Sequence, residues 1–295
     1  MAVSVDSRAP VVTSRRGRTP AAQARHLTGR TVYYAVMVAL AIIFLLPLIW
    51  MLSTSLKTEA QTLSIPPTFI LTDPQWNNYV EVFQVIPTFL YNSMKLAALN
   101  VVGLLFFCSL AGYAFGRLNF PGRDAAFLVL LATAILPSIV YLLPQYILFL
   151  NLGWIDTHYP LWVPRILTPV IGTFLLRQAF KTIPNELEDA AKIDGASTFK
   201  IYWRIMLPQV KPAMAAVGIL TFLESWNDLF GPLIFLNSRD LQTLPVALAL
   251  FQGEFLTRLD LLMAGATISV VPVLVLFFAT QRYFIQGISM EGLKG

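Results

Sequence analysis

Residues 183–212 read IPNELEDAAKIDGASTFKIYWRIMLPQVKP, the longest polar stretch between apolar runs in the second half of the chain. The stretch predicts two short helices joined by a tight turn. Pro184 suits a helix start, because its missing N–H would be unpaired there, and residues 185–193 are good helix formers. Gly195 predicts a left-handed stop. Ser197 can then cap a second helix, which Pro208 is expected to end.

Four residues of the first of these helices fall along one side. Leu187, Ala190, Ala191 and Asp194 recur at helical spacing and therefore share a face. The two adjacent alanines leave room for another surface to come close. Two interpretations follow from the residues alone: an amphipathic loop that lies on a membrane, or a plug that fits a partner protein.

The composition predicts an all-α membrane protein. Of 295 residues, 56% are hydrophobic and only 13% are charged, which is too apolar for a soluble globular chain. Several apolar runs approach the roughly 20 residues that a helix needs to cross a bilayer. We therefore predict six transmembrane helices, the third of them interrupted by Pro137 and Pro144. The predicted spans are 32–52, 92–115, 125–149, 161–180, 213–236 and 259–281.

The spans divide the chain into segments. Residues 1–30 are rich in Arg, Ser, Thr, Ala and Pro and predict a disordered basic tail. Residues 53–91 form a polar loop, 92–282 the main transmembrane domain, and 283–295 a C-terminal tail. The N-terminal region could instead begin a signal peptide, but the run 32–52 is longer than a signal core and no clear A-x-A site follows. We therefore interpret it as an uncleaved first span.

The distribution of positive charge orients these spans. Of the 21 Lys and Arg residues, all but five fall in the two tails, the turn at 117–123 and the region around 183–212. By the positive-inside rule, both termini and the 183–212 loop are predicted to be cytoplasmic, and the 53–91 loop extracytoplasmic. The net charge of +5 does not suggest nucleic-acid binding, because the positive residues flank apolar runs. The five exceptions are Lys57, Lys95, Arg165, Arg239 and Arg258.

The polar loop also carries a recognisable pattern. Asp189-Ala190-Ala191 precedes Gly195 by three residues, and Ile205-Met206-Leu207-Pro208 follows. This resembles the E-A-A-x-x-x-G and I-x-L-P pattern of the coupling loop in ABC importer permeases. Asp189 departs from the usual Glu and is one methylene shorter, so either it reaches its partner less well or Glu188 shares its role.

The resemblance extends from about residue 92 to 295. It includes AGYAFGRLNFPG at 111–122, the WND triplet at 226–228 and the GLKG ending. Pro184, Glu186-Leu187 and the run from Asp194 to Ser197 resemble the sugar-importing branch, in particular the second permease of maltose-type systems. The resemblance implies a type I ABC importer permease fold, located in the cell (inner or plasma) membrane in contact with lipid.

This resemblance further implies a set of partners: a second permease, two ATPase subunits and an extracytoplasmic solute-binding protein. The loop would seat on an ATPase that uses ATP and Mg. No G-x-x-x-x-G-K-[ST] phosphate loop occurs in this chain, so it is expected to bind no cofactor and to be no enzyme itself. The residues implied for coupling are Glu188, Asp189, Ala190, Ala191, Asp194, Gly195, Leu207 and Pro208.

Polar residues inside the predicted fifth span form a second candidate site. Glu224, Trp226, Asn227 and Asp228 could line a path for a hydroxyl-rich solute, with Trp226 stacking on a sugar ring. They could equally bond a neighbouring helix or lie near the membrane interface. Alternative functions are a permease of the same architecture for another solute, a membrane-embedded enzyme, or a secondary transporter. The sequence predicts no metal site and no catalytic residues.

Overall fold

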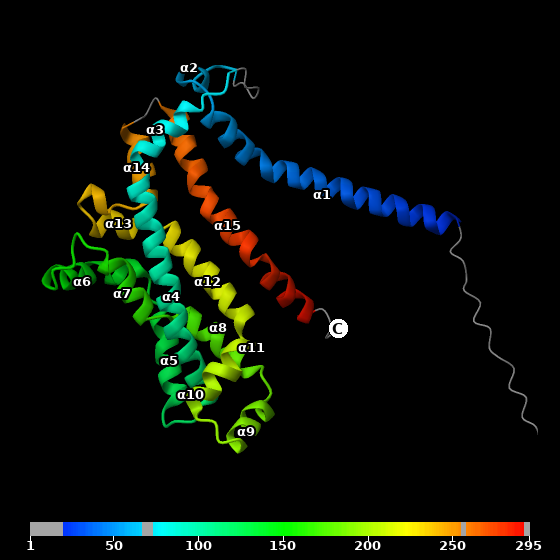
Figure 1. The fold of residues 1–295 in the computed structure, drawn as a ribbon, viewed down its shortest axis with the longest axis vertical. Helices are drawn as coiled ribbons and strands as arrows, with labels where there is room; N and C mark the ends of the chain where they lie inside the picture. Colours follow the sequence, from blue (N-terminus) through cyan, green and yellow to red (C-terminus); the bar gives the residue numbers. More distant parts are fainter. Residues whose placement is uncertain (1–19, 67–72, 255–257, 292–295) are drawn as a thin grey trace, which may run out of the picture. The chain divides into compact units, whose positions relative to one another are not determined.

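The computed structural model describes residues 20–66, 73–254 and 258–291 (Figure 1), and all of their regular elements are helical. The chain divides between Trp50 and Met51 into two compact units, which are described separately. Four described helical segments are long and apolar enough to cross a membrane, and a fifth is added if a bent pair counts as one. The long apolar helices confirm the all-α prediction.

The first unit is built on one long helix. Helix α1 spans Pro20–Ser55 and contains Pro47. Its segment Arg30–Ser55 has a mean hydropathy of 2.8, in agreement with the predicted first span. The helix begins twelve residues earlier than the predicted span. Residues 21–29 explain this, because alanine, glutamine, arginine and leucine are good helix formers. The rest of the predicted basic tail, residues 1–19, lies outside the described residues.

Helix α4 (Pro87–Arg117) is the centre of the second unit. It packs against α7 (Tyr159–Leu167), α8 (Val170–Lys181) and α12 (Lys211–Trp226). Two glycines let α4 and α8 approach closely. A Cβ on Gly112 would lie 2.9 Å from Leu176 Cβ, and one on Gly172 would lie 3.1 Å from Cys108. Buried Cys108 is therefore a packing residue at this contact.

Apolar clusters surround α4 at different levels. One joins α4 and α8 to the 183–212 segment. A second joins α4 and α12 to α3 (Asn77–Val85), α14 (Leu244–Glu254) and α15 (Leu259–Glu291). A third includes Phe149 and Phe235, whose rings lie 5.3 Å apart. Each level of α4 therefore contacts different segments of the chain.

The third and fifth predicted spans are broken. Residues 125–149 form two helices, α5 (Arg123–Thr133) and α6 (Ser138–Asn151). The break precedes Pro137, since proline disfavours helix in the residue before it, whereas Pro144 is tolerated inside α6. Figure 1 shows α6 running across the direction of α5. Residues 213–236 form α12 and the short helix α13 (Phe230–Phe235), separated at 227–229.

The predicted polar loop and C-terminal tail also contain helix. Residues 53–91 hold α2 (Glu59–Thr62), α3 and the start of α4. Helix α15 covers the predicted sixth span and continues to Glu291, into the predicted tail. A single 3-10 turn, Arg239–Leu241, precedes α14. Within the described residues, the predicted 53–91 loop and the predicted tail are therefore partly helical.

Candidate functional site

The 183–212 segment, which we call the coupling loop, contains the two predicted helices. They are α9 (Asn185–Ile193), preceded by Pro184, and α10 (Thr198–Ile201). Gly195 has φ +74°, which confirms the predicted left-handed stop. The Ser197 hydroxyl accepts a hydrogen bond from Lys200 N at 3.4 Å, as predicted for a cap. The loop lies beside the Arg117 end of α4 (Figure 1).

The second helix of the coupling loop does not end at Pro208, contrary to the prediction. It continues through a π-helical turn, Tyr202–Met206, into α11 (Leu207–Gln209). Proline cannot donate a backbone hydrogen bond, and its ring crowds the carbonyl four residues earlier. The wider π turn just before Pro208 accommodates both effects. The chain then bends by 77° into α12.

The two faces of α9 separate the residues implied for coupling. Glu188 and Ala191 are each only 7% exposed, and Ala191 belongs to the apolar cluster, whereas Leu187, Ala190 and Asp194 are exposed. The predicted four-residue face is therefore split, since Ala191 is taken up by internal packing. The Asp189 side chain is 67% exposed. Of the two adjacent carboxylates, Asp189 is the one open to a partner.

Lys192 lies beside both carboxylates. Its Nζ is 3.4 Å from Glu188 Oε1 and 3.5 Å from Asp189 Oδ1. These pairs are one turn apart on the helix, where opposite charges stabilise it modestly.

Contacts with α4 hold the coupling loop in place. The Arg117 guanidinium donates to the Ile183 carbonyl and to Asn185 Oδ1. The Tyr202 and Ser109 hydroxyls lie 2.7 Å apart, and the Tyr202 ring lies 5.2 Å from that of Tyr113. Burial raises the pKa of the Tyr202 phenol. Polar and aromatic contacts therefore fix both halves of the loop to one helix.

Large apolar side chains project outward from the coupling loop. Ile193 is 87% exposed and Phe199 67% exposed, and Trp203 stacks on Phe199 with ring centroids 6.4 Å apart. Leu187 is also exposed, and it is the one large exposed apolar residue of this loop that the sequence analysis named. The spacing of Phe199 and Trp203, four apart in a predicted helix, was the signal that could have found the others.

The residues predicted for a substrate path are not gathered into one site. Glu224 and Asn227 are exposed, on α12 and just after it. Trp226 is only 3% exposed, stacks on Phe222 at 5.4 Å, and donates from Nε1 to the Ser269 carbonyl of α15 at 3.2 Å. This ring is part of the α12–α15 packing and is not free to stack on a sugar.

Asp228 lies in the break between α12 and α13 and has a partner that sequence reasoning missed. Its Oδ2 is 3.6 Å from Arg165 NH2 of α7, and its Oδ1 accepts from Gly231 N at 3.0 Å. Nearby, Asn100 of α4 donates to Ser225 Oγ at 2.8 Å. Because Arg165 lies more than 60 residues earlier in the chain, no local pattern indicated the pair.

Two residues of the α6–α7 connection, Asp156 and His158, make hydrogen bonds to a distant segment. The Asp156 carboxylate accepts from the backbone N–H groups of Asn237 and Ser238 at 2.9 and 2.8 Å, and from the Ser238 hydroxyl. These bonds hold the Asp156 pKa below its usual range. His158 Nε2 lies 2.8 Å from the Leu241 carbonyl, and burial lowers its pKa. Both residues attach the α6–α7 connection to the segment after α13.

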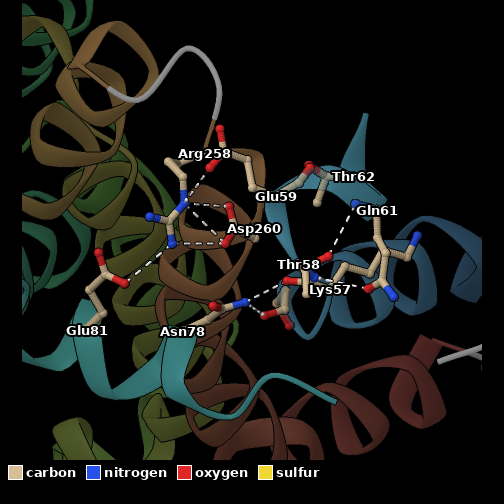
Figure 2. Close-up of polar contacts among 10 residues, drawn as sticks. Lys57, Thr58, Glu59, Gln61, Thr62, Asn78, Glu81, Arg258 and Asp260 are labelled. Atoms are coloured by element: carbon tan, nitrogen blue, oxygen red, sulfur yellow. Dashed lines mark hydrogen bonds and ion pairs between the residues drawn. The ribbon is translucent and has the colours of Figure 1, made fainter. Parts of the chain in front are cut away.

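An ionic cluster forms at the α3 end of the same unit, and we call it the Arg258 cluster (Figure 2). The guanidinium of Arg258 lies 3.1 Å from Asp260 Oδ2, 3.4 Å from Glu81 Oε2 and 3.9 Å from Glu59 Oε2. The three carboxylates come from α15, α3 and α2. Asp260 is only 1% exposed. Asp260 and Glu81 raise the pKa of Arg258.

Asn78 of α3 reinforces this cluster. Its Nδ2 donates to the Ser55 and Lys57 carbonyls at 3.0 and 2.9 Å (Figure 2). The Arg258 cluster, together with Asn78, therefore ties α2, α3 and α15 to one another. Across the described part of the chain, no group of three or more His, Cys, Asp or Glu side chains is placed to hold a metal ion.

Comparisons with known proteins agree with this architecture. The arabinooligosaccharides transport system permease protein AraQ of Halalkalibacterium halodurans is 35% identical over 271 residues, covering 90% of this chain and 95% of AraQ. The structure is similar to a bacterial ABC transporter involved in import of the acidic polysaccharide alginate, with a TM-score of 0.72, 24% identity, and coverage of 88% and 98%.

A second structure of a bacterial alginate ABC transporter was solved in complex with an alginate pentasaccharide-bound periplasmic protein. It matches with a TM-score of 0.60 and 16% identity, covering 87% of this chain and 94% of that one. The family model described as binding-protein-dependent transport system inner membrane component matches residues 19–290. The chain belongs to this family of inner membrane transport components.

Proposed function

We propose that this chain is the transmembrane permease subunit of an ATP-driven importer that translocates a sugar, either an oligosaccharide or a sugar derivative. The main observation behind this proposal is the structure of the coupling loop. It is a rigid helix–turn–helix fixed to α4 from inside by Arg117, and it presents Ile193 and Phe199 outward. Such exposed apolar side chains on a polar segment are typical of a docking surface.

The docking partner of this surface is an ATPase subunit. The chain itself has no phosphate loop, so ATP and Mg would be used by two separate ATPases. Ala190 leaves space for a close approach, and exposed Asp189 offers a carboxylate to a basic side chain of the partner. Movement of the ATPases would be transmitted through the coupling loop to α4 and would alternate access to the path.

A second permease and a solute-binding protein complete the assembly. The complex of the alginate transporter with its periplasmic protein supports the binding-protein partner. We infer that the imported solute is a sugar, since the relative AraQ is named for arabinooligosaccharides and the similar structure belongs to a transporter of the polysaccharide alginate. Asp228 with Arg165, together with Glu224 and Asn227, would supply hydrogen-bonding groups along the path.

We propose six crossings, of which four or five correspond to described helical segments that are long and apolar enough; residues 123–151, which hold α5 and α6, would supply the third. Both termini and the coupling loop would then lie on the cytoplasmic side. The distribution of positive residues supports this orientation.

The coupling surface is tested by comparing two isoleucines. Ile193→Asp places a charge on the coupling loop, while Ile65→Asp makes the same change at a 96% exposed position in the loop before α3. Each variant is purified in mild detergent from cells that express the whole transport system. We expect Ile193→Asp to lose the co-purifying ATPase and Ile65→Asp to retain it, with equal amounts of chain in the membrane. Retention of the ATPase by both variants would contradict the proposal.

A further inference from the structure

Helix α3 turns apolar side chains outward and polar side chains inward. Trp76, just before the helix, is 66% exposed, Val80 56% and Phe83 53%. These residues recur at intervals of four and three, so they form one ridge, which we call the α3 ridge. On the opposite side of the helix, Asn78 is buried and Glu81 is half-buried. A solvated amphipathic helix would show the reverse pattern.

Polar contacts fix this orientation. Glu81 is drawn inward by Arg258, and Asn78 is held by two backbone carbonyls (Figure 2). Val82, on the inner side, is 4% exposed and packs in the cluster with α15. With its polar side chains bound internally, α3 cannot rotate to hide the ridge without breaking these contacts.

The length of α4 places α3 at a membrane surface. α4 has 31 residues, which at 1.5 Å per residue is about 46 Å. A bilayer with its headgroups is about 40–45 Å thick, so α4 reaches from one headgroup layer to the other. α3 ends at Val85, and α4 begins at Pro87. The α3 ridge therefore lies at the depth where α4 leaves the bilayer.

A second observation marks the same depth. Near this end of α4, Tyr91 is 66% exposed, and Lys95 Nζ lies 5.7 Å from its ring centre. Exposed tyrosines and lysines that reach toward headgroups are typical of the membrane interface. Further along α4, the apolar side chains of Met94 and Val102 are also exposed.

We propose that α3 is an interfacial membrane helix that inserts the α3 ridge among the lipid headgroups and upper acyl chains. Exposed Asn77 and Gln84 flank the ridge and remain in water. The Arg258 cluster holds the helix in this position from behind. The helix directly precedes the Pro87 end of α4.

Nitroxide scanning of the full chain tests this proposal. The single cysteine, Cys108, is buried in a close contact, so Cys108→Ala gives a clean background with little loss of packing. Val80→Cys and Phe83→Cys place labels on the ridge, and Asn77→Cys and Gln84→Cys are matched controls on the same helix. Accessibility to oxygen and to a water-soluble nickel chelate is measured in phosphatidylethanolamine–phosphatidylglycerol nanodiscs.

We expect an oxygen-to-nickel accessibility ratio several-fold higher at 80 and 83 than at 77 and 84. Equal nickel accessibility at all four positions would show that the ridge is in water and would overturn the proposal. Protection of 80 and 83 from both reagents would show a protein contact in place of lipid and would also overturn it. All four positions are exposed, so each label reports independently of the others.

Discussion

The two ends of α4 are attached to the rest of the unit by different physical means. At the Arg117 end, the coupling loop is held by hydrogen bonds and aromatic packing between two segments, and both its helices are local in sequence. Beyond the Pro87 end, Arg258 joins α2, α3 and α15, which lie up to about 200 residues apart, through ion pairs. The two helices of the coupling loop follow from a local pattern, whereas the Arg258 cluster exists only after folding.

This difference predicts different responses to mutation. At the Arg258 cluster one side chain satisfies several carboxylates, so its loss should destabilise the fold. At the coupling loop the attachment is divided among several contacts, while the surface that faces outward can change without unfolding the protein. The variants below separate stability at one end from coupling at the other.

The largest effect is expected for Arg258→Ala. It leaves Asp260, which is 1% exposed, without its cation, and an unpaired buried carboxylate is costly. Because Arg258 itself is 28% exposed, we expect a loss of about 2–3 kcal/mol, at the low end for broken buried pairs. Thermal unfolding in detergent measures it.

Two further variants control for charge at this end. Arg239→Ala removes an exposed arginine from the turn before α14 and should change the unfolding temperature little. Adding Asp260→Asn to Arg258→Ala should recover part of the loss. If Arg239→Ala is as destabilising as Arg258→Ala, the cluster is not a specific tether.

Gly195→Val should mainly affect coupling. A β-branched residue at φ +74° costs about 1–2 kcal/mol in backbone strain, although nothing lies within 4 Å of its Cβ. We expect about a tenfold loss of transport-coupled ATPase activity, with the amount of chain in the membrane unchanged. Gly195→Asn should retain more activity, because asparagine tolerates this conformation. Disappearance of the valine variant from the membrane would instead make Gly195 a folding residue.

The hydrogen bond between Ser109 and Tyr202 offers a finer test at the same end. Ser109 Oγ also bonds the Phe106 carbonyl at 3.0 Å, so Tyr202→Phe leaves it with a partner. We expect Tyr202→Phe to cost about 1 kcal/mol. Ser109→Ala should cost more, about 1–3 kcal/mol, because it leaves the Tyr202 hydroxyl buried and unpaired. Denaturant unfolding of both variants shows which one loses more stability. A larger loss for Tyr202→Phe than for Ser109→Ala would contradict this hydrogen-bond arrangement.

The smallest effect concerns His158, near the Arg258 end. Its pKa is lowered below 6.5, mainly by burial, so the folded state disfavours the protonated ring. The contribution of neutral His158 to the free energy of unfolding is therefore fully present above the unfolded-state pKa of about 6.5. It declines as the pH falls from there toward the lower folded-state pKa. We expect a lower unfolding temperature at pH 5 than at pH 7.5 and a weaker dependence in His158→Gln. An unchanged pH dependence in that variant would exclude this role.

The coupling loop could be predicted from sequence in unusual detail, because caps, helix formers and a left-handed glycine act within a few residues. Gly195 and Ser197 are examples. The side of α9 that faces inward could not be predicted, since Glu188 and Asp189 are neighbours and only packing against α4 distinguishes them. For Trp226 the sequence left both a stacking role and a bond to a neighbouring helix open, and only the structure shows its hydrogen-bond partner on α15.

The sequence by itself determined the all-helical membrane class, the position of the long apolar helices and the local form of the coupling loop. These depend on composition, on apolar run length and on backbone preferences of single residues. Only the tertiary structure decided that Asp228 pairs with Arg165, that Arg258 ties three segments together, and that α3 turns its apolar ridge outward. Those arrangements depend on distances between segments far apart in the chain, which local sequence patterns do not encode.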